Sequence, residues 1–240
     1  MKNKIIRFIK KQVKQSKAAG VVLGLSGGID SAVVAVLCRE ALGRDKVLCL
    51  VLPCGSRKED LLDAAALVKK FKLRAVFLDL EDIYRVYSKV LPKAQRMACA
   101  NLKARLRMTV IYYFANKFNY LVCGTSNKSE RMMGYFTKYG DGAADILPLG
   151  SLLKRQVRRL ASTLNIPEAI LKKAPTAGLW PGQTDESEMG MSYNDLDDIL
   201  FRLQKGQKQS GKSSLVKRVR SSIGSSQHKR RVPPICVIDG

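Results

Sequence analysis

Hydrophobic positions along the chain follow two alternating patterns. Short apolar runs rich in β-branched residues indicate buried strands, and they cover residues 21–25, 46–52, 74–80 and 120–123. Stretches in which apolar residues recur every three or four positions indicate amphipathic helices. These cover residues 4–18, 30–42, 57–71, 81–90, 94–117, 154–164, 167–173, 192–204 and 212–223. The alternation predicts an α/β fold: a doubly wound parallel sheet with helices on both faces.

The length of 240 residues suits one domain with appendages. A basic helix over residues 4–18 precedes an α/β core over residues 20–174. Residues 175–192 contain two prolines, three glycines and three acids, which predicts a mobile lid loop. C-terminal helices and a basic tail fill residues 192–240. We therefore expect a single domain, and we find no internal repeat.

The charge is strongly positive, with 43 Lys and Arg against 20 Asp and Glu, a net +23. Such a balance suggests a nucleic-acid partner. However, residues 1–20 carry seven basic groups and no acid, and residues 202–231 carry ten and no acid. The excess thus lies mainly in two terminal segments, where solvated helix faces are the commoner explanation. We expect no nucleic acid as a partner.

Several other classes are excluded by composition. The sequence has no run of 18 apolar residues and no apolar segment typical of a secretory signal near its start. We therefore expect a cytoplasmic protein without a membrane span. The six cysteines form no C-x-x-C pair, and His228 is the sole histidine. Buried, reduced thiols are expected, and a zinc site built from Cys and His is not.

The apolar run 21–25 ends in Ser26-Gly27-Gly28-Ile29-Asp30-Ser31, which a helix follows. Paired glycines let backbone N–H groups surround an anion, two hydroxyls add donors, and the helix presents its positive N-terminus. This strand–turn–helix pattern predicts a phosphate or pyrophosphate cradle. The loop lacks the lysine of a Walker motif. A carboxylate such as Asp30 among phosphates is suited to holding Mg²⁺.

The segment Gly24–Ser31 resembles the pyrophosphate loop of the N-type ATP pyrophosphatases. Further blocks follow in a fixed order, from Gly124-Thr125-Ser126-Asn127-Lys128-Ser129-Glu130 through the residues 134–149 to Lys154-Arg155-Gln156-Val157. Pro175-Thr176-Ala177, residues 180–186 and His228-Lys229-Arg230 complete the set. In this order and spacing, the chain resembles the ammonia-dependent NAD synthetases over residues 5–234. The resemblance implies an adenine nucleotide α-hydrolase-like, Rossmann-like fold.

The resemblance also implies which residues form the site. Asp30 and Glu130 match metal ligands, and Ser26, Asp30 and Lys154 match catalytic positions. The ATP-binding positions are Gly24, Leu25, Ser26, Gly27, Gly28, Ile29, Asp30, Ser31, Thr125, Lys154 and Thr176. The positions that match contacts to deamido-NAD (nicotinic acid adenine dinucleotide) are Arg105, Lys138, Asp145, His228 and Lys229. One departure is Gly178, which stands where members often have Asp.

The activity implied is ATP-dependent amidation of deamido-NAD to NAD with Mg²⁺, through an adenylated carboxylate, releasing AMP and pyrophosphate. Members of this type are homodimers. The chain has no room for a glutaminase beside the synthetase, so the nitrogen donor is expected to be free ammonia or ammonia from a separate protein.

Two alternatives remain, a tRNA-modifying pyrophosphatase and a nucleotide-binding or nucleic-acid-binding protein without enzymatic activity. A Walker-like spacing at residues 206–213 follows a predicted helix instead of a strand, so we do not expect a P-loop there.

Overall fold

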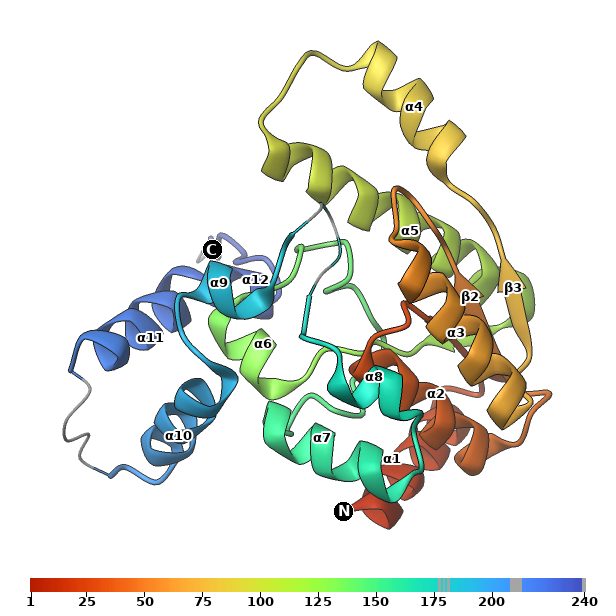
Figure 1. The fold of residues 1–240 in the computed structure, drawn as a ribbon, viewed down its shortest axis with the longest axis horizontal. Helices are drawn as coiled ribbons and strands as arrows, with labels where there is room; N and C mark the ends of the chain where they lie inside the picture. Colours follow the sequence, from red (N-terminus) through yellow and green to blue (C-terminus); the bar gives the residue numbers. More distant parts are fainter. Residues whose placement is uncertain (177, 179, 181, 208–212, 239–240) are drawn as a thin grey trace.

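Four strands form one parallel sheet in a computed structural model of the chain (Figure 1). The structure describes residues 1–240 except 177, 179, 181, 208–212 and 239–240. The strands are β1 (Gly20–Gly24), β2 (Val47–Val51), β3 (Ala75–Phe77) and β4 (Tyr120–Val122). Their order is β3-β2-β1-β4, and Val21 of β1 lies opposite Val47 and Leu121. The predicted parallel sheet is confirmed.

The helices lie close to the predicted positions. In chain order they are α1 (Lys2–Gln15), α2 (Ile29–Leu42), α3 (Lys58–Phe71), α4 (Glu81–Val90), α5 (Arg96–Phe118), α6 (Lys128–Met133), α7 (Lys154–Thr163), α8 (Glu168–Lys172), α9 (Asp185–Met189), α10 (Tyr193–Gln204), α11 (Ser213–Ser225) and α12 (Gln227–Arg230). Because helices connect the strands, every pairing in the sheet is parallel.

Alternate residues of the central strand face two different layers. Val21 and Leu23 belong to an apolar cluster that includes residues of α1, α2, α3, α7 and α8. Val22 belongs to a second cluster, with Leu50 of β2 and residues of α5. Since successive side chains of a strand point to opposite faces, both faces of the sheet are covered. The doubly wound arrangement expected from the sequence is confirmed.

The structure differs from the sequence-based prediction in four places, one of which is the unpredicted four-residue helix α12. Strand β3 is three residues long, where residues 74–80 were expected, and its exposed end residue Phe77 reflects its position at the edge of the sheet. Helix α6 was not predicted, because six residues are too few to show periodicity. The expected lid loop contains the short helix α9. Residues 177, 179 and 181 of this loop lie outside the described part of the chain.

A separate apolar cluster joins the C-terminal helices to the rest. It includes Leu153, Met189, Tyr193, Leu196 and Val219. These residues come from α9, α10, α11 and the segment just before α7. Leu153 thus places the start of α7 against the C-terminal helices. The Walker-like segment follows helix α10, as expected, and its residues 208–212 lie outside the described part.

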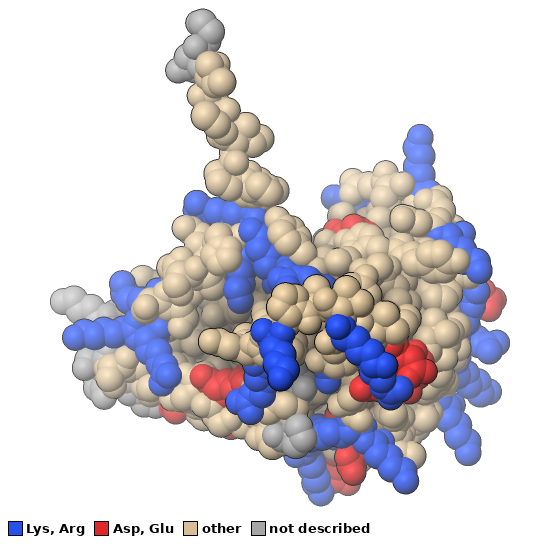
Figure 2. All heavy atoms as spheres, turned by 90° about the horizontal axis from the view of Figure 1, so that it is seen from above, with Lys and Arg blue, Asp and Glu red and all other residues tan. Residues whose placement is uncertain are grey.

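Across the residues that the structure describes, no helix combines the length and apolar character needed to cross a bilayer. Lys and Arg side chains are spread over the face seen in Figure 2. Four of the six cysteines are buried free thiols, as predicted; Cys99 is half-buried and Cys236 is exposed. The hydrogen bond with the Cys123 thiol, together with burial, raises the pKa of Cys38, whose Sγ lies 3.6 Å from that of Cys123.

Candidate active site

A cavity of about 590 Å³ lies beyond the carboxyl ends of the strands. Its lining includes Gly24 at the end of β1, Val51 at the end of β2 and Val122 at the end of β4. Ligands of parallel α/β sheets bind at this edge, where loops from several strands converge. The cavity is therefore the candidate active site.

The Ser26–Ser31 loop forms one side of the cavity and is held by its own hydroxyls. Ser31 Oγ donates to the Gly28 carbonyl at 2.9 Å and accepts from the Ser26 backbone N–H at 3.2 Å. Ser26 Oγ accepts from the Gly28 N–H at 3.3 Å. Gly28 is the N-cap of α2. A preformed turn at a helix N-terminus favours an anionic ligand such as a phosphate.

Gly27 is required by this turn for two reasons. Its φ of +78° is in the left-handed region that other residues rarely adopt. A Cβ at this position would also lie 2.2 Å from the Asp60 carbonyl oxygen at the start of α3. The turn therefore depends on a close backbone approach to the first turn of α3.

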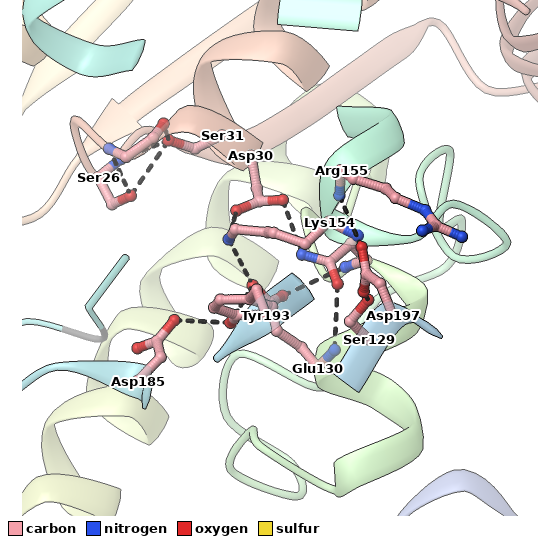
Figure 3. Close-up of polar contacts among 12 residues, drawn as sticks. Ser26, Asp30, Ser31, Ser129, Glu130, Lys154, Arg155, Asp185, Tyr193 and Asp197 are labelled. Carbon is pink, nitrogen blue, oxygen red and sulfur yellow. Dashed lines mark hydrogen bonds and ion pairs between the residues drawn. The ribbon is translucent and has the colours of Figure 1, made fainter. Parts of the chain in front are cut away.

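Lys154 connects the two predicted metal carboxylates (Figure 3). Its Nζ donates to Asp30 Oδ2 at 2.6 Å and to Glu130 Oε1 at 2.9 Å. The lysine side chain is 3% exposed, and the two carboxylates are 16% and 15% exposed. Asp30 lies in the first turn of α2, Glu130 lies in α6 and Lys154 begins α7. The fold thus brings together three residues that are up to 124 positions apart.

Asn127 forms hydrogen bonds with both acids and fixes their relative positions. Its Nδ2 donates to Asp30 Oδ1 at 2.9 Å. Its side-chain oxygen accepts from the Glu130 N–H at 3.0 Å, and its own N–H donates to Glu130 Oε2 at 3.2 Å. This reciprocal pair is the capping box of α6. One buried asparagine therefore starts a helix and orients both acids.

The carboxylates carry more negative charge than Lys154 neutralises. Burial and the nearby Asp30 raise the pKa of Glu130 to about 7, against the opposing effect of Lys154. Burial alone would lower the pKa of Lys154, but Asp30 and Glu130 raise it overall. Mg²⁺ commonly binds through one or two carboxylates with waters and substrate phosphates. A buried acid pair with surplus negative charge fits that ion.

Asp197 on α10 fixes the start of α7. This buried carboxylate accepts from Ser129 Oγ at 2.5 Å and from the Arg155 N–H at 2.8 Å. Ser129 Oγ in turn accepts from the Lys154 N–H at 3.0 Å. A carboxylate at a helix N-terminus is favoured by the helix dipole. Asp197 therefore positions the backbone from which Lys154 extends.

Asp185 from the lid region and Tyr193 from α10 extend this network. Tyr193 Oη donates to Asp185 Oδ2 at 2.8 Å and lies 3.5 Å from Glu130 Oε1. Lys154 Nζ lies 4.9 Å from the centroid of the Tyr193 ring. Burial is the main cause that raises the pKa of Asp185. Asp185 therefore lies beside the group formed by Asp30, Lys154 and Glu130.

Most of the residues expected to bind ATP or a metal line the cavity. These are Gly24, Leu25, Ser26, Gly28, Ile29, Asp30, Ser31, Thr125, Glu130, Lys154 and Thr176. Gly27 instead packs against Asp60. Of the residues expected to contact deamido-NAD, Lys229 lines the cavity and its Nζ donates to two backbone carbonyls, at 2.8 and 3.0 Å.

The other four residues expected to contact deamido-NAD lie outside this cavity lining. Arg105 is exposed on α5 and donates to the Lys138 carbonyl at 3.2 Å. Asp145 accepts from the Val122 N–H at 2.7 Å, which anchors the end of β4. His228 is exposed in α12. Within one chain, Lys138, Asp145, Arg105 and His228 are not gathered around the cavity.

The chain matches known proteins over almost its whole length. A sequence model described as NAD synthase matches residues 1–233. The chain belongs to the NAD synthase family. The NH(3)-dependent NAD(+) synthetase of Archaeoglobus fulgidus is 46% identical over 234 residues, which is 97% of this chain and 94% of that protein.

Solved structures of similar proteins share the fold. An NH3-dependent NAD synthetase from Campylobacter jejuni, solved with a nitrate ion, has a TM-score of 0.87 and 34% identity, covering 98% of this chain and 97% of its own. A structure described as NMN synthetase, from Francisella tularensis, has a TM-score of 0.90 and 38% identity, covering 99% and 97%. The expected adenine nucleotide α-hydrolase-like fold is confirmed.

Several residues of the candidate site in this NAD synthase family member were not predicted from the sequence. Asp197 had a visible signal, because the helical spacing puts it on the same face as Tyr193, Leu196 and Leu200, all apolar or aromatic. A lone acid on a buried face needs partners. Asn127 could have been found as a helix cap followed three residues later by Glu130. Asp185 had no comparable signal, because the charged groups near it, Lys154 and Asp30, are distant in sequence.

A second missed feature is a charged cluster beside the phosphate loop. Asp60 accepts from Arg57 Nε at 2.9 Å and from Lys173 Nζ at 2.9 Å. Burial raises the pKa of Asp60, but these two cations outweigh it and lower the pKa overall. Lys173 also pairs with Asp63. The cluster joins α3 to the segment after α8 and supports the loop that contains Gly27.

Proposed function

We propose that this chain is an ammonia-dependent NAD synthetase, which amidates deamido-NAD to NAD at the expense of ATP and releases AMP and pyrophosphate. The observation that carries the proposal is the pairing of a phosphate-binding turn with Lys154, Asp30 and Glu130 in one cavity. Family membership and curated relatives named NH(3)-dependent NAD(+) synthetases support the same reaction.

The site's own groups suit the first half of this reaction. The carboxylate of deamido-NAD would attack the α-phosphorus of ATP, breaking the bond to pyrophosphate and forming an acyl-adenylate. The Ser26–Ser31 turn would take the departing pyrophosphate with its N–H groups and hydroxyls. In this proposal Lys154, Thr125 and Thr176 contact ATP. Lys154 would also offset the charge that develops on the phosphate oxygens. Ser26, Asp30 and Lys154 are the residues that we place nearest the reacting atoms.

In the second half, ammonia would attack the carbonyl carbon of the adenylate and AMP would leave with the electron pair of the broken bond. The lid region holds Thr176 and Asp185, both of which line the cavity. We propose that this region excludes water, which would otherwise hydrolyse the adenylate. Free ammonia, or ammonia from a separate protein, would serve as the nitrogen donor.

We propose that Asp30 and Glu130 hold Mg²⁺. Bound there, the ion would neutralise charge on the ATP phosphates. Two carboxylates that share one lysine leave a negative charge for a cation to balance. The same two side chains also face the cavity that would receive ATP.

We also propose that the chain works as a homodimer. Helix α4 has no buried residue among its described positions, and its apolar side chains Ile83, Val86, Tyr87 and Val90 are 45–78% exposed. A face of this kind is typical of a subunit interface. A second subunit could bring Arg105, Lys138, Asp145 or His228 to the deamido-NAD site. The mass of the purified chain in solution, by sedimentation equilibrium, tests this directly.

The whole chain would form one synthetase unit in this proposal. Asp30 belongs to the α/β core, Asp185 to the lid region and Tyr193 to the C-terminal helices, and these residues meet at Lys154. A division between residues 174 and 192 would split the site. We also propose a cytoplasmic location, because the buried free thiols fit a reducing compartment.

The deciding experiment is an assay of the purified protein with ATP, Mg²⁺, deamido-NAD and ammonium chloride. We expect NAD, AMP and pyrophosphate in equal amounts, and loss of all three when Mg²⁺ is chelated. Pyrophosphate without NAD would show that adenylation survives but ammonia must arrive otherwise. If neither product forms, the proposal fails.

A second candidate substrate follows from one comparison. The Francisella tularensis structure is described as an NMN synthetase, and its TM-score of 0.90 is the larger of the two reported above. The deamidated mononucleotide should therefore be assayed in parallel. We expect the larger kcat/KM with deamido-NAD; the reverse order would make this chain an NMN synthetase. Binding of tRNA that persists at high salt would instead favour the tRNA-modifying alternative.

A further inference from the structure

The cavity wall beyond β2 is formed by a segment that has left the sheet. Strand β2 ends at Val51, and Pro53 has no N–H with which to continue the hydrogen bonding. Leu52, Pro53 and Ser56 all line the cavity. The Pro53 carbonyl accepts from the Leu80 N–H at 2.8 Å. The carbonyls of the residues on either side of the proline need other donors.

Arg107 of α5 supplies these donors and also lines the cavity. Its Nε donates to the Leu52 carbonyl at 2.9 Å. Its Nη2 donates to the Cys54 carbonyl at 3.4 Å and to Ser56 Oγ at 3.3 Å. A planar guanidinium carries five N–H donors in a fixed fork, so one side chain can hold three acceptors at once. For this segment, Arg107 therefore replaces the hydrogen bonds that a neighbouring strand would provide.

The charge of Arg107 is not neutralised by a bonded acid. Its hydrogen bonds with the described part of the chain all go to uncharged acceptors. Burial is the main cause that lowers the pKa of Arg107, because the cation is partly removed from water. A neutral side chain would avoid this cost. The fork of donors is therefore the feature of arginine that the segment uses.

The segment formed by residues 52–56 adjoins the phosphate turn at both of its ends. Just before the segment, the Leu50 carbonyl accepts from the Leu25 N–H at 2.8 Å. Just after it, α3 begins, and the Asp60 carbonyl oxygen of its first turn would lie 2.2 Å from a Cβ on Gly27. Protein interiors are close-packed and transmit strain. A shift of the segment would therefore reach the turn.

Resting on the function proposed above, we propose that Arg107 is a positioning residue for ATP. It fixes the segment 52–56 against α5, and through the first turn of α3 it keeps the phosphate turn in the shape that receives the nucleotide. It acts through the segment and not by touching the reacting atoms. The site for ATP therefore depends on the geometry of its donors, whereas the site for deamido-NAD does not.

The test compares two variants in the NAD assay, with the second substrate saturating. Arg107→Lys keeps the charge but replaces the fork by one ammonium, and Arg107→Gln keeps an amide donor without the charge. We expect both to raise the KM for ATP at least fivefold and to leave the KM for deamido-NAD within twofold of wild type. Arg74→Lys is the matched control and should change neither KM by more than twofold. Arg74 also donates to a backbone carbonyl, that of Asp45 at 3.2 Å, but at the amino ends of β2 and β3.

A direct contact between the charge and a substrate predicts a different result. Arg107→Lys would then keep the KM for ATP near that of wild type, whereas Arg107→Gln would raise it. That pattern would overturn the inference, and so would equal rises in both KM values or no rise in the KM for ATP. Failure of the proposed function would appear in the wild type itself, as an absence of NAD.

A further variant keeps the inference testable if the Arg107 variants do not fold. Gly55→Ala leaves Arg107 in place but puts a Cβ at a φ of +65° inside the same segment. It should raise the KM for ATP at least threefold. Gly43→Ala, at a φ of +83° and outside the cavity lining, should leave that KM within twofold of wild type. Equal KM values for ATP in these two variants would count against a role of the segment.

Discussion

The two sides of the cavity are built in different ways. The phosphate turn is contiguous, since its hydrogen bonds join residues between Ser26 and Ser31. The other part, which shares Asp30 with this turn, is assembled from α2, α6, α7 and α10, with Lys154 between Asp30 and Glu130 and Asp197 bonded to the start of α7. Hydrogen bonds there link residues as far apart as 124 positions.

This difference predicts which part of the site depends most on tertiary packing. A short turn loses little conformational entropy when it closes and can be formed locally. A buried group of two acids and one lysine forms only if tertiary packing holds all its members, because an unpaired buried charge is strongly unfavourable. The assembled side should therefore be the more sensitive to substitution.

The largest expected effect is that of Lys154→Met. It removes the cation between Asp30 and Glu130 and should lower the free energy of unfolding by about 3–5 kcal/mol in a chelator. NAD formation should also fall at least about 100-fold. Urea unfolding and the NAD assay measure the two effects. Lys172→Met is the control, since Lys172 is 76% exposed in its pair with Glu168 and should cost less than about 1 kcal/mol. Equal stability losses in the two variants would contradict the contrast.

The next effect is a pH dependence caused by Glu130. Its pKa is about 7 in the folded chain against a reference value of 4.5. Between these values the folded state binds more protons than the unfolded state, so the stability of the metal-free protein should fall as the pH rises. The decline should be on the order of 3 kcal/mol. Urea titrations at pH 5 and pH 8 test this.

In Glu130→Gln the decline between pH 5 and pH 8 should be much smaller. Addition of Mg²⁺ at pH 8 should raise the stability of wild type more than that of the variant, since the ion binds the ionised acid. Parallel pH curves for wild type and variant would show that Glu130 is not the group responsible.

The smallest effect concerns the contiguous turn. Gly27→Ala and Gly43→Ala both place a Cβ at positive φ, +78° and +83°. Only the first brings it within 2.2 Å of the Asp60 carbonyl, whereas a Cβ on Gly43 meets no described atom within 4 Å. Gly27→Ala should therefore cost about 1–3 kcal/mol more than Gly43→Ala, which isolates the crowding from the backbone strain. Thermal unfolding of both variants measures the difference. If they are equally destabilised, the turn is independent of α3.

Much of the fold was predictable because periodicity reflects which side chains are buried. The strands near residues 21–25 and 46–52 and the helices α2, α3, α5 and α10 lie within a few residues of their predicted bounds. The exceptions have local causes. The edge strand β3 is only partly buried, and α6 is shorter than two turns.

The phosphate turn was also predictable, since Ser26, Gly27, Gly28 and Ser31 act through backbone shape and nearby hydroxyls. Asp30 and Glu130 were named as metal ligands from a family resemblance. The structure places both within hydrogen-bond distance of Lys154 Nζ. Asp185 and Tyr193 could not be found in this way, because nothing in their own segment indicates a neighbour such as Glu130.

The sequence by itself determined the parallel α/β architecture, the glycine turn at Ser26–Ser31 and the family, because these depend on the order and spacing of residues along the chain. Tertiary structure alone decided that Asn127 joins Asp30 to Glu130, that Asp197 fixes the start of α7, and that Oδ1 of the buried Asp185 has no hydrogen-bond partner among the described residues. The physical reason is that hydrogen bonding and charge neutralisation act over a few ångströms in space. Only the packing of α6, α7, α9 and α10 brings those atoms within that range.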